Sequence, residues 1–446
     1  MTATRVFRGA AAVRESLLRR RPLGVADLGP DSNDRLRRAY GVDLTPEDFV
    51  DRVFKEVADG GDREIARLTR AIDGVEPATL EVPSDELRRA YGAAEAELLD
   101  DLETAAKRIR QFHERTKPNS WFDDRLGLGQ QITPIERVGI YAPGGTAAYP
   151  SSILMTVIPA VVAGVGEIIM CTPPGPSGLP ASVTLAAASI AGVSRVFAVG
   201  GAQAVAGMTL GTETIPKVDK IAGPGNVFVV LAMRKAFGTV GVSLLPGPTE
   251  TLIIADGVAD PEQVAADMLA QAEHDVLASP LLLTDSADLA QEVLNELDRQ
   301  LPSLPRKRIA AESLRTLGGV GTVSNLDEAA DLANEYAPEH LCLLVSDPTS
   351  LARKIRNAGG VFLGRGSPEV LGDYVAGPSH VMPVAGTARF ASPLNVGDFM
   401  KITSVFNLPG DECESLAVVA ARLARAEGLE AHARAADLRT ERSAAS

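Results

Sequence analysis

The chain has 446 residues, of which 45% are hydrophobic and 23% charged, and its 44 basic and 58 acidic residues give a net charge of −14. This length predicts two or more domains, and the composition excludes disordered, fibrous and membrane proteins. The excess of acidic residues argues against a general nucleic-acid-binding surface, which needs clustered positive charge. No uninterrupted apolar run reaches the roughly 20 residues that a membrane span needs.

The cysteines and the one long basic run predict little chemistry of their own. Cys171, Cys342 and Cys413 lie far apart without CxxC spacing, so we expect free thiols and a cytoplasmic protein. Arg19, Arg20 and Arg21 form a basic run without the apolar segment of a signal peptide, and we interpret it as a solvated helix end.

The amino-terminal region, residues 1–136, is predicted to be helical and to pack in part on the second α/β domain. Ser84 is placed as the N-cap of a long run rich in Ala, Glu, Leu and Arg that continues to about Arg115. Lys117, Pro118 and Asn119 end this helix.

Short apolar runs that alternate with Ala-rich helical segments follow from residue 137. This alternation predicts parallel βαβ units and a first Rossmann-like domain over residues 137–245. The strands are expected at Arg137–Tyr141, Glu167–Cys171 and Arg195–Val199.

A second series of such runs predicts a second Rossmann-like domain over residues 246–382, with Pro246–Pro248 as the hinge. Residues 383–446 are expected to form an arm with one long helix, Asp411–Arg439, and a disordered tail from Thr440. The strands of the second domain are expected at Thr251–Ala255, Pro280–Thr284, His340–Val345 and Gly360–Leu363.

Gln271 and His274 are the first candidates for a metal site, among only five histidines in the chain. Asp260 as N-cap, Pro261 and Glu262 predict the start of their helix. Residues three apart share a helix face, so the amide oxygen and the imidazole could bind one metal ion. Taken alone, the pair is weak evidence for a metal site, and a solvated helix face is the alternative.

Glu339 and His340 form a second candidate cluster, where Pro338 ends a helix begun by Asn325 and a strand follows. A histidine near neutral pKa suits a general base. Adjacent residues of an extended segment point opposite ways, so the two side chains need not act on the same atom. The alternative is that His340 only packs at the strand edge.

Three Gly-rich turns, each between an apolar and a helical run, could bring backbone amides to a pyrophosphate. None is a complete GxGxxG motif, and each also fits an ordinary turn. Asp373 follows another Gly-rich turn, and His432 lies on the last helix; neither stands out alone. The three turns are Pro143–Gly145, Gly200–Gln203 and Gly223–Asn226.

Taken together, these segments resemble the histidinol dehydrogenase family over nearly the whole chain, in the same order and at similar intervals. The resemblance implies two Rossmann-like domains arranged as in aldehyde dehydrogenases, with a helical amino-terminal segment and a helical arm. The matching segments are Tyr141–Thr146, Gly200–Ala204, Gly223–Asn226, Gln271–His274, Ala337–His340 and Gly372–Tyr374.

The resemblance implies oxidation of L-histidinol to L-histidine through bound L-histidinaldehyde, the last step of histidine biosynthesis, with two NAD and one zinc ion per subunit. It also implies a domain-swapped homodimer in which the arm gives Glu427 and His432 to the neighbouring site. By the same resemblance the zinc ligands are Gln271, His274, Asp373 and His432; the NAD contacts Tyr141, Gln203 and Asn226; the substrate contacts Thr249, Gln271, His274, His340, Asp373, Glu427 and His432; and the acid/base pair Glu339 and His340.

Two departures from the family pattern bear on the substrate. Thr249 stands where the family usually has Ser, and Ser379 where Asn usually precedes His380. The alternative function is a related zinc and NAD dehydrogenase of another small polar alcohol, such as a sulfonated diol. The carboxylate of Glu427 suits a cationic substrate and would repel a sulfonate. A catalytically inactive relative is the third reading, but the proposed ligands and bases are all present.

Overall fold

The computed structural model describes residues 4–20, 37, 40–42, 44–75, 77, 79–144, 148–245 and 247–440. Arg21 of the basic run, Gly145 and Thr146 of the first Gly-rich segment, Pro246 of the predicted hinge and the tail beyond Thr440 lie outside these residues. Two compact units, residues 1–117 with 135–399 and residues 118–134 with 400–446, are described separately below. No helix in the described part is long and apolar enough to span a membrane.

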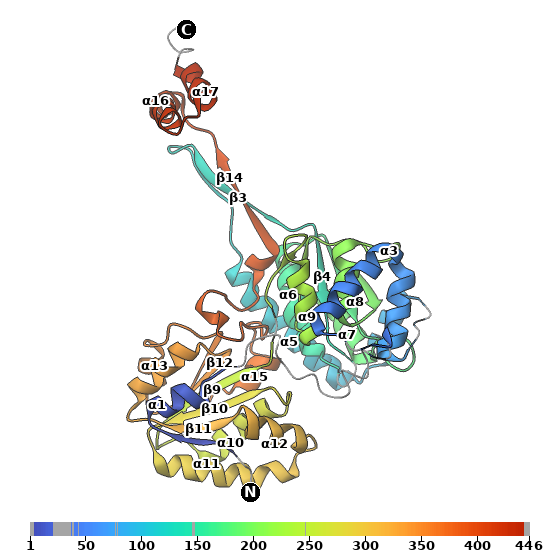
Figure 1. Ribbon diagram of the computed structural model, residues 1–446, viewed down its shortest axis with the longest axis vertical. Helices are drawn as coiled ribbons and strands as arrows, with labels where there is room; N and C mark the ends of the chain where they lie inside the picture. The colour runs from blue at the N-terminus through green and yellow to red at the C-terminus, as the bar shows by residue number, and fades with distance from the viewer. Residues whose placement is uncertain are drawn as a thin grey trace. The chain divides into compact units, whose positions relative to one another are not determined.

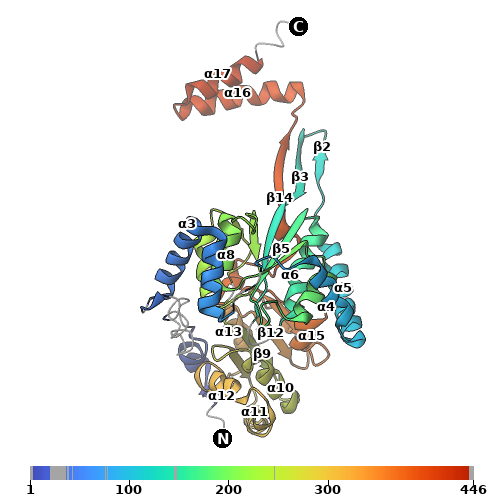
Figure 2. The same cartoon turned by 90° about the vertical axis from the view of Figure 1, so that its right-hand side faces the viewer.

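The first lobe of the larger unit is built on a five-stranded parallel sheet in the order β6-β5-β4-β7-β8. Helices α3, α8 and α9 share one core with the sheet, and α6 packs against β4, β5 and α7 (Figure 2). The strands are β4 (Arg137–Tyr141), β5 (Glu167–Thr172), β6 (Arg195–Ala198), β7 (Lys220–Ala222) and β8 (Gly241–Val242); the helices are α3 (Pro46–Asp73), α4 (Ser84–Ala93), α5 (Ala96–Thr116), α6 (Pro150–Ala163), α7 (Ser182–Ala191), α8 (Gly201–Leu210) and α9 (Val227–Ala236).

The second lobe is a six-stranded parallel sheet in the order β1-β11-β10-β9-β12-β13, with helices on both faces (Figure 1). Its strands are β1 (Val6–Arg8), β9 (Glu250–Ala255), β10 (Ser279–Thr284), β11 (Gly319–Thr322), β12 (His340–Leu344) and β13 (Gly360–Leu363). The helices are α1 (Ala10–Ala12), the π-helix η1 (Val13–Leu17), α10 (Pro261–Ala272), α11 (Ala287–Gln300), η2 (Leu301–Ser303), α12 (Lys307–Thr316), α13 (Leu326–Tyr336), α14 (Pro348–Ala352) and α15 (Glu369–Tyr374), followed by η3 (Thr387–Arg389) and η4 (Val396–Phe399).

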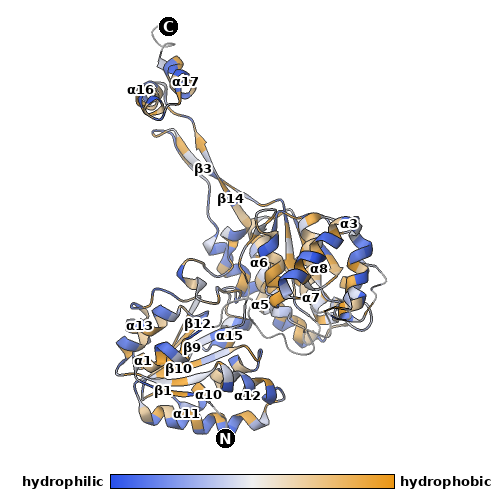
Figure 3. Cartoon of the chain, in the orientation of Figure 1, coloured by the Kyte–Doolittle hydropathy of each residue, from blue (hydrophilic) through white to orange (hydrophobic). Residues whose placement is uncertain are grey.

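Strand alternation divides the second lobe into two cores, because successive side chains of a strand point to opposite faces. Ile253 and Ala255 of β9 pack with α10, α11 and α12, whereas Leu252 and Ile254 pack with η1 and α13. Both faces are therefore buried, which explains why the strands read as continuous apolar runs. Figure 3 shows the same logic in the helices: α6, buried nearly all round, is largely hydrophobic, and the outer helix α11 alternates hydrophobic and hydrophilic residues.

The smaller unit consists of a three-stranded antiparallel sheet, in the order β14-β3-β2, and two helices that pack on each other. Leucine, valine and aromatic side chains of this unit remain exposed, among them Phe406 at 73% and Leu423 at 60%. Its elements are β2 (Trp121–Asp123), β3 (Leu128–Pro134), β14 (Met400–Phe406), α16 (Gly410–Ala426) and α17 (Glu430–Thr440).

The α/β class with two parallel sheets is confirmed, and the predicted strands lie within one residue of the observed ones. Residues 118–134, assigned from the sequence to the amino-terminal region, instead pair with β14 of the arm. The predicted helix from Ser84 to Arg115 is two helices, interrupted at Ala94 and Glu95, and Ser84 is its first residue rather than its cap.

Two further expectations about the chain ends are wrong. The predicted helix Asp411–Arg439 is a pair of helices separated at Gly428, whose φ of 77° ends α16. Arg20, expected on a solvated helix end, forms an ion pair with Glu250 in which the two side chains are only 22% and 7% exposed.

Candidate active site

In the first lobe, polar side chains lie at the carboxyl ends of the neighbouring strands β4 and β7. The chain leaves β4 for β5 and β6 on one side and returns to β7 on the other, so the carboxyl ends of β4 and β7 flank a topological switch point. Tyr141 ends β4, and Asn226 caps α9 after β7 by accepting hydrogen bonds from Phe228 N and Val229 N at 3.1 and 3.3 Å.

Two close contacts shape this place. Tyr141 OH accepts a hydrogen bond from Gly201 N at 3.1 Å, at the start of α8. Gly223 has a φ of 125°, and a Cβ there would lie 2.1 Å from Tyr141 O, so only glycine fits. Gln203, in the first turn of α8, is fully buried, and neither of its amide atoms has a hydrogen-bond partner. A buried amide without a partner is unfavourable unless a ligand meets it.

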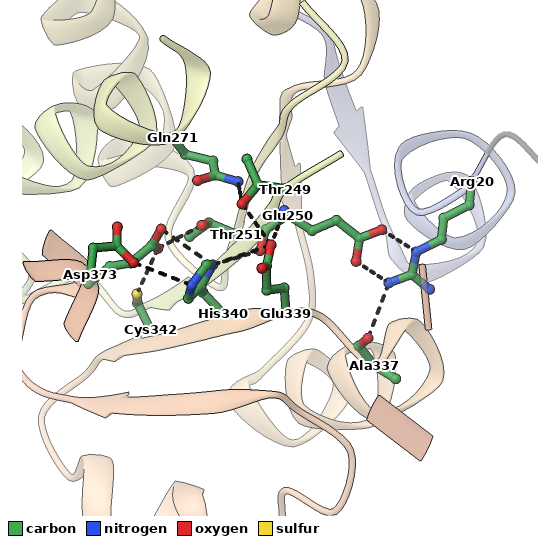
Figure 4. A network of polar contacts seen from close by, with 11 residues as sticks. Arg20, Thr249, Glu250, Thr251, Gln271, Ala337, Glu339, His340, Cys342 and Asp373 are labelled. Atoms are coloured by element: carbon green, nitrogen blue, oxygen red, sulfur yellow. Dashed lines mark hydrogen bonds and ion pairs between the residues drawn. The ribbon is translucent and has the colours of Figure 1, made fainter. Parts of the chain in front are cut away.

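In the second lobe, Glu339 and His340 lie at the amino ends of parallel strands rather than the carboxyl ends. His340 is the first residue of β12 and pairs in register with Thr251, the second residue of β9. The segments that enter these neighbouring strands, Thr249–Glu250 and Glu339–His340, therefore lie side by side (Figure 4).

The Nδ1 atom of His340 faces three oxygen atoms. It lies 3.3 Å from the Glu250 carbonyl oxygen, 3.4 Å from Glu369 Oε1 and 3.7 Å from Glu339 Oε2. The expectation that Glu339 and His340 would point apart is therefore wrong, because Glu339 precedes the strand and turns back toward the imidazole. His340 Nε2 is buried without a hydrogen-bond partner and lies 3.7 Å from Asp373 Oδ1.

Glu339 is held by a relay of hydrogen bonds from Gln271 through Thr249. Thr249 Oγ1 donates to Glu339 Oε2 at 2.6 Å, and Glu250 N donates to the same oxygen at 3.0 Å. The single hydroxyl proton of Thr249 is thereby used, so Gln271 Nε2 donates to Thr249 Oγ1 at 2.9 Å. This fixes the orientation of the amide, and Gln271 Oε1 is left buried without a partner.

His274 and Asp373 differ in local structure from the expectation. Helix α10 ends at Ala272, so His274 lies in the following turn, where its N donates to Gln271 O at 3.3 Å, rather than on a shared helix face. Asp373 lies within the short helix α15, not after a turn. This helix packs so closely on β13 that a Cβ at Gly372 would lie 2.5 Å from the Phe362 ring.

Two side chains of this cluster had no role in the sequence analysis. Glu369 is buried on α15 and accepts from Thr251 Oγ1 at 2.6 Å, while Cys342 Sγ lies 3.8 Å from the same carboxylate. His380 joins the lobes: its Nδ1 donates to Asp373 O at 2.6 Å, and its Nε2 lies 3.1 Å from Ser152 Oγ on α6. Neither belongs to a local motif, so no sequence signal singled them out.

Burial dominates the electrostatics of the cluster. It raises the pKa of Glu339 to about 7, although His340, the Thr249 hydroxyl and Glu250 N–H oppose the shift. Burial and the Asp373 charge raise the pKa of Glu369 well above its ordinary value. Desolvation lowers the pKa of His274, against the attraction of Asp373, which shows that these two side chains interact electrostatically.

Two of the residues singled out in the sequence belong to the smaller unit. Glu427 and His432 are exposed there, whereas Gln271 and Asp373 belong to the larger unit. Within the described residues, no three His, Cys, Asp or Glu side chains are arranged to hold a metal ion. Cys342 is a buried strand residue, as expected.

The two departures have different surroundings. Thr249 retains the hydroxyl that binds Glu339. Ser379 lies outside the cluster, where its Oγ donates to Met155 O at 3.0 Å and accepts from Val381 N at 3.2 Å. The substitution at residue 249 therefore leaves the hydrogen-bond relay in place.

Comparison with known proteins assigns the chain to a family. The sequence profile of the family "Histidinol dehydrogenase" matches residues 37–440. A histidinol dehydrogenase of Dehalococcoides mccartyi is 48% identical over 437 residues, which cover 98% of this chain and 100% of that protein. One from Aquifex aeolicus is 50% identical over 415 residues, covering 91% of this chain and 96% of the relative. A crystal structure of histidinol dehydrogenase from Elizabethkingia anophelis, 33% identical, matches with a TM-score of 0.91 over 100% of both chains. The match of fold, of sequence over nearly its full length and of motif order shows that the chain belongs to the histidinol dehydrogenase family.

Proposed function

We propose that the protein oxidises L-histidinol to L-histidine in two steps, with two NAD molecules and a zinc ion per subunit. The observation that carries this proposal is the buried cluster at the entry of β9 and β12, where a glutamate with a pKa of about 7 touches a histidine whose Nε2 is free. Groups of this kind suit proton transfer at neutral pH.

His340 is the base for the hydroxyl proton. Because Nδ1 faces the Glu250 carbonyl and two carboxylates, the neutral ring carries its proton there. Nε2 then offers its lone pair to the substrate. The imidazolium formed when Nε2 takes the hydroxyl proton is stabilised by the carboxylate of Glu339.

Glu339 serves the second step, which adds the oxygen of water to the aldehyde. Its pKa of about 7 leaves a substantial carboxylate fraction at neutral pH, and the hydrogen bonds from Thr249 and Glu250 N fix its position. The carboxylate takes one proton from water as the oxygen bonds to the aldehyde carbon. The anion of the hydrate formed in this way gives its one C–H hydrogen as hydride to the second NAD, and the acid that results loses its remaining O–H proton to His340 Nε2, which leaves the carboxylate product.

The buried side-chain oxygen of Gln271 supports a zinc site. Its Oε1 is buried, without a partner, and oriented by the bond from Nε2 to Thr249, as expected for an oxygen ligand. We assign Gln271, His274 and Asp373 of one subunit as ligands, together with His432 of the partner subunit. When bound, zinc supplies a Lewis acid that holds the substrate's nitrogen atoms and polarises its hydroxyl oxygen.

NAD fits the switch point of the first lobe. The buried amide of Gln203 without a hydrogen-bond partner, and the positions of Tyr141 and Asn226 after β4 and β7, support this assignment. When bound there, NAD accepts the hydride of each step. The α6 helix that follows β4 reaches the second lobe through Ser152 and His380, which links the two sites.

We infer a homodimer in which Glu427 and His432 complete the neighbouring site. Large apolar side chains exposed on β14 and α16, such as Ile402 at 61% and Leu423 at 60%, call for a covering surface. A second copy of the chain would supply this surface in the homodimer that the family resemblance implies. We also retain the expectation of a cytoplasmic protein, which accords with the free thiols of Cys171, Cys342 and Cys413.

The proposal is tested by counting NADH released by zinc-loaded protein from limiting L-histidinol, beside a sulfonated diol. We expect two NADH per histidinol and none from the diol; one NADH, or a preference for the diol, would overturn the proposal.

His274→Asn should lower the zinc content measured by atomic emission, and chelation should remove activity. Full zinc occupancy in the variant would contradict the ligand assignment.

A further inference from the structure

Arg20 lies behind the catalytic cluster and binds both of its entering segments (Figure 4). Its Nε and Nη2 donate to Glu250 Oε1 and Oε2 at 2.5 and 2.6 Å, in a two-point ion pair. Nη2 also donates to Ala337 O at 3.2 Å, and Nη1 to Tyr336 O. The guanidinium stacks on the Tyr336 ring, with Cζ 3.7 Å from the ring centroid. Only arginine can make these contacts together, because its planar guanidinium group donates several hydrogen bonds in fixed directions and can also stack on an aromatic ring.

Unfavourable backbone conformations occur beside this ion pair. Among the described residues, only Ala337 and Ala385 have a positive φ without being glycine, at 53° and 56°. Arg20 binds the carbonyl of Ala337, and the Ala385 backbone opposes the rise in the pKa of Glu250 that burial causes. Residues with a Cβ adopt this conformation only where the surroundings hold them, and such places are concentrated at functional sites.

The backbone held in this way leads directly into the site. Ala337 is two residues before Glu339 and three before His340. Glu250, the other partner of Arg20, contacts both catalytic candidates through its main chain: its N donates to Glu339 Oε2 at 3.0 Å, and its O faces His340 Nδ1 at 3.3 Å. Arg20 thus fixes the two segments whose relative position sets the geometry of the pair.

We propose that Arg20 is a positioning residue. From the amino-terminal segment, it holds Glu339 and His340 in the relative position that proton transfer needs, and it does not touch the substrate. This inference rests on the proposed function. Displacements of about 1 Å at a reacting group can cost on the order of 100-fold in rate, so the loss should appear in kcat.

A matched control is available on the same segment. Arg14, on η1, also forms a two-point ion pair with α13, to Glu335 at 2.6 and 2.9 Å, but both side chains are about half exposed and the pair does not reach the site. Arg14→Ala removes a similar two-point ion pair from the same amino-terminal segment. It should leave kcat within about twofold, since exposed ion pairs contribute little.

The experiment compares Arg20→Ala, Arg20→Lys and Arg14→Ala in the zinc-loaded, full-length protein. We expect Arg20→Ala to lower kcat by about 10- to 100-fold with the KM for NAD and the zinc content unchanged, and Arg20→Lys to fall between, because an ammonium cannot bind at two points. Millimolar guanidinium chloride should restore part of the kcat of Arg20→Ala, whereas urea should not.

The outcomes separate this inference from the proposed function. If the wild-type protein does not oxidise histidinol, the proposed function fails and this inference with it. If the wild-type protein is active but Arg20→Ala, corrected for its folded fraction, keeps the wild-type kcat, the positioning role is overturned. An equal loss in Arg14→Ala, or a loss in Arg20→Ala that guanidinium does not relieve, would equally contradict it, because each indicates a general role in folding.

Discussion

The hydroxyl of Thr249 adjusts the pKa of Glu339, the proposed base of the second step. Its hydrogen bond favours the charged form of Glu339 and so lowers a pKa that burial raises to about 7. Removing the hydroxyl should raise that pKa further. Because water activation needs the carboxylate, the acid limb of the kcat profile should move to higher pH.

We therefore expect Thr249→Val, of nearly equal volume, to shift the acid limb upward from about 7, as measured by NADH release against pH. Thr249→Ser keeps the hydroxyl and should leave the limb in place. A limb that stays unchanged in Thr249→Val would show that another group controls it.

The sequence could predict the residues of the site only where a local pattern marks them. Glu339 and His340 follow a helix-ending proline, and Gln271 lies on a well-capped helix, so the sequence was sufficient to single out these residues. Arg20, Glu250 and Glu369 contact partners that lie 27 to 317 residues away, and nothing near them in the sequence indicates those partners.

At the scale of elements, the buried parallel strands were predictable because burial on both faces makes each one a continuous apolar run. β2, β3 and β14 were not predicted because β2 and β14 are largely exposed, β3 is half-buried, and all three mix polar with apolar residues. β1 and β11 are short, and their pairing joins residues more than 300 positions apart, which no local pattern can show.

Helix ends in a left-handed conformation give a stability prediction. Gly192 ends α7 at a φ of 91°, and a Cβ there would meet only Val161 at 3.7 Å, so Gly192→Ala meets backbone strain without a clash. We expect a loss of about 1 kcal/mol in the free energy of unfolding, measured by urea denaturation.

The complementary change is at the end of α13, where Ala337 occupies the same conformation with a φ of 53°. Ala337→Gly should stabilise the protein by up to about 1 kcal/mol, since glycine is the usual residue there. Equal signs for the two substitutions would show that contacts, and not the backbone, decide the outcome.

At the scale of the whole molecule, the proposed exchange of arms predicts complementation between subunits. His340→Asn and His432→Asn should each be inactive alone. If His432 serves the neighbouring site, a heterodimer of the two variants has one site with both lesions and one with none.

Mixing the variants under conditions of subunit exchange should therefore restore activity, to about a quarter of the wild-type value for random pairing. NADH release measures it, and native mass spectrometry of differently tagged chains demonstrates the exchange. Exchange without any recovery of activity would mean that His432 serves its own subunit.

The early segment that contains β1 and Arg20 also sets the timing of assembly during synthesis. Val6 of β1 pairs with Val320, and Arg20 binds the carbonyl groups of Tyr336 and Ala337, so this early segment finds its partners only when most of the chain has followed. At about 5 to 20 residues per second, the wait is on the order of 15 to 60 s. Arg20 is therefore already present when residues 336–340 are made, and it can hold the turn before Glu339 and His340 as soon as that turn has left the ribosome.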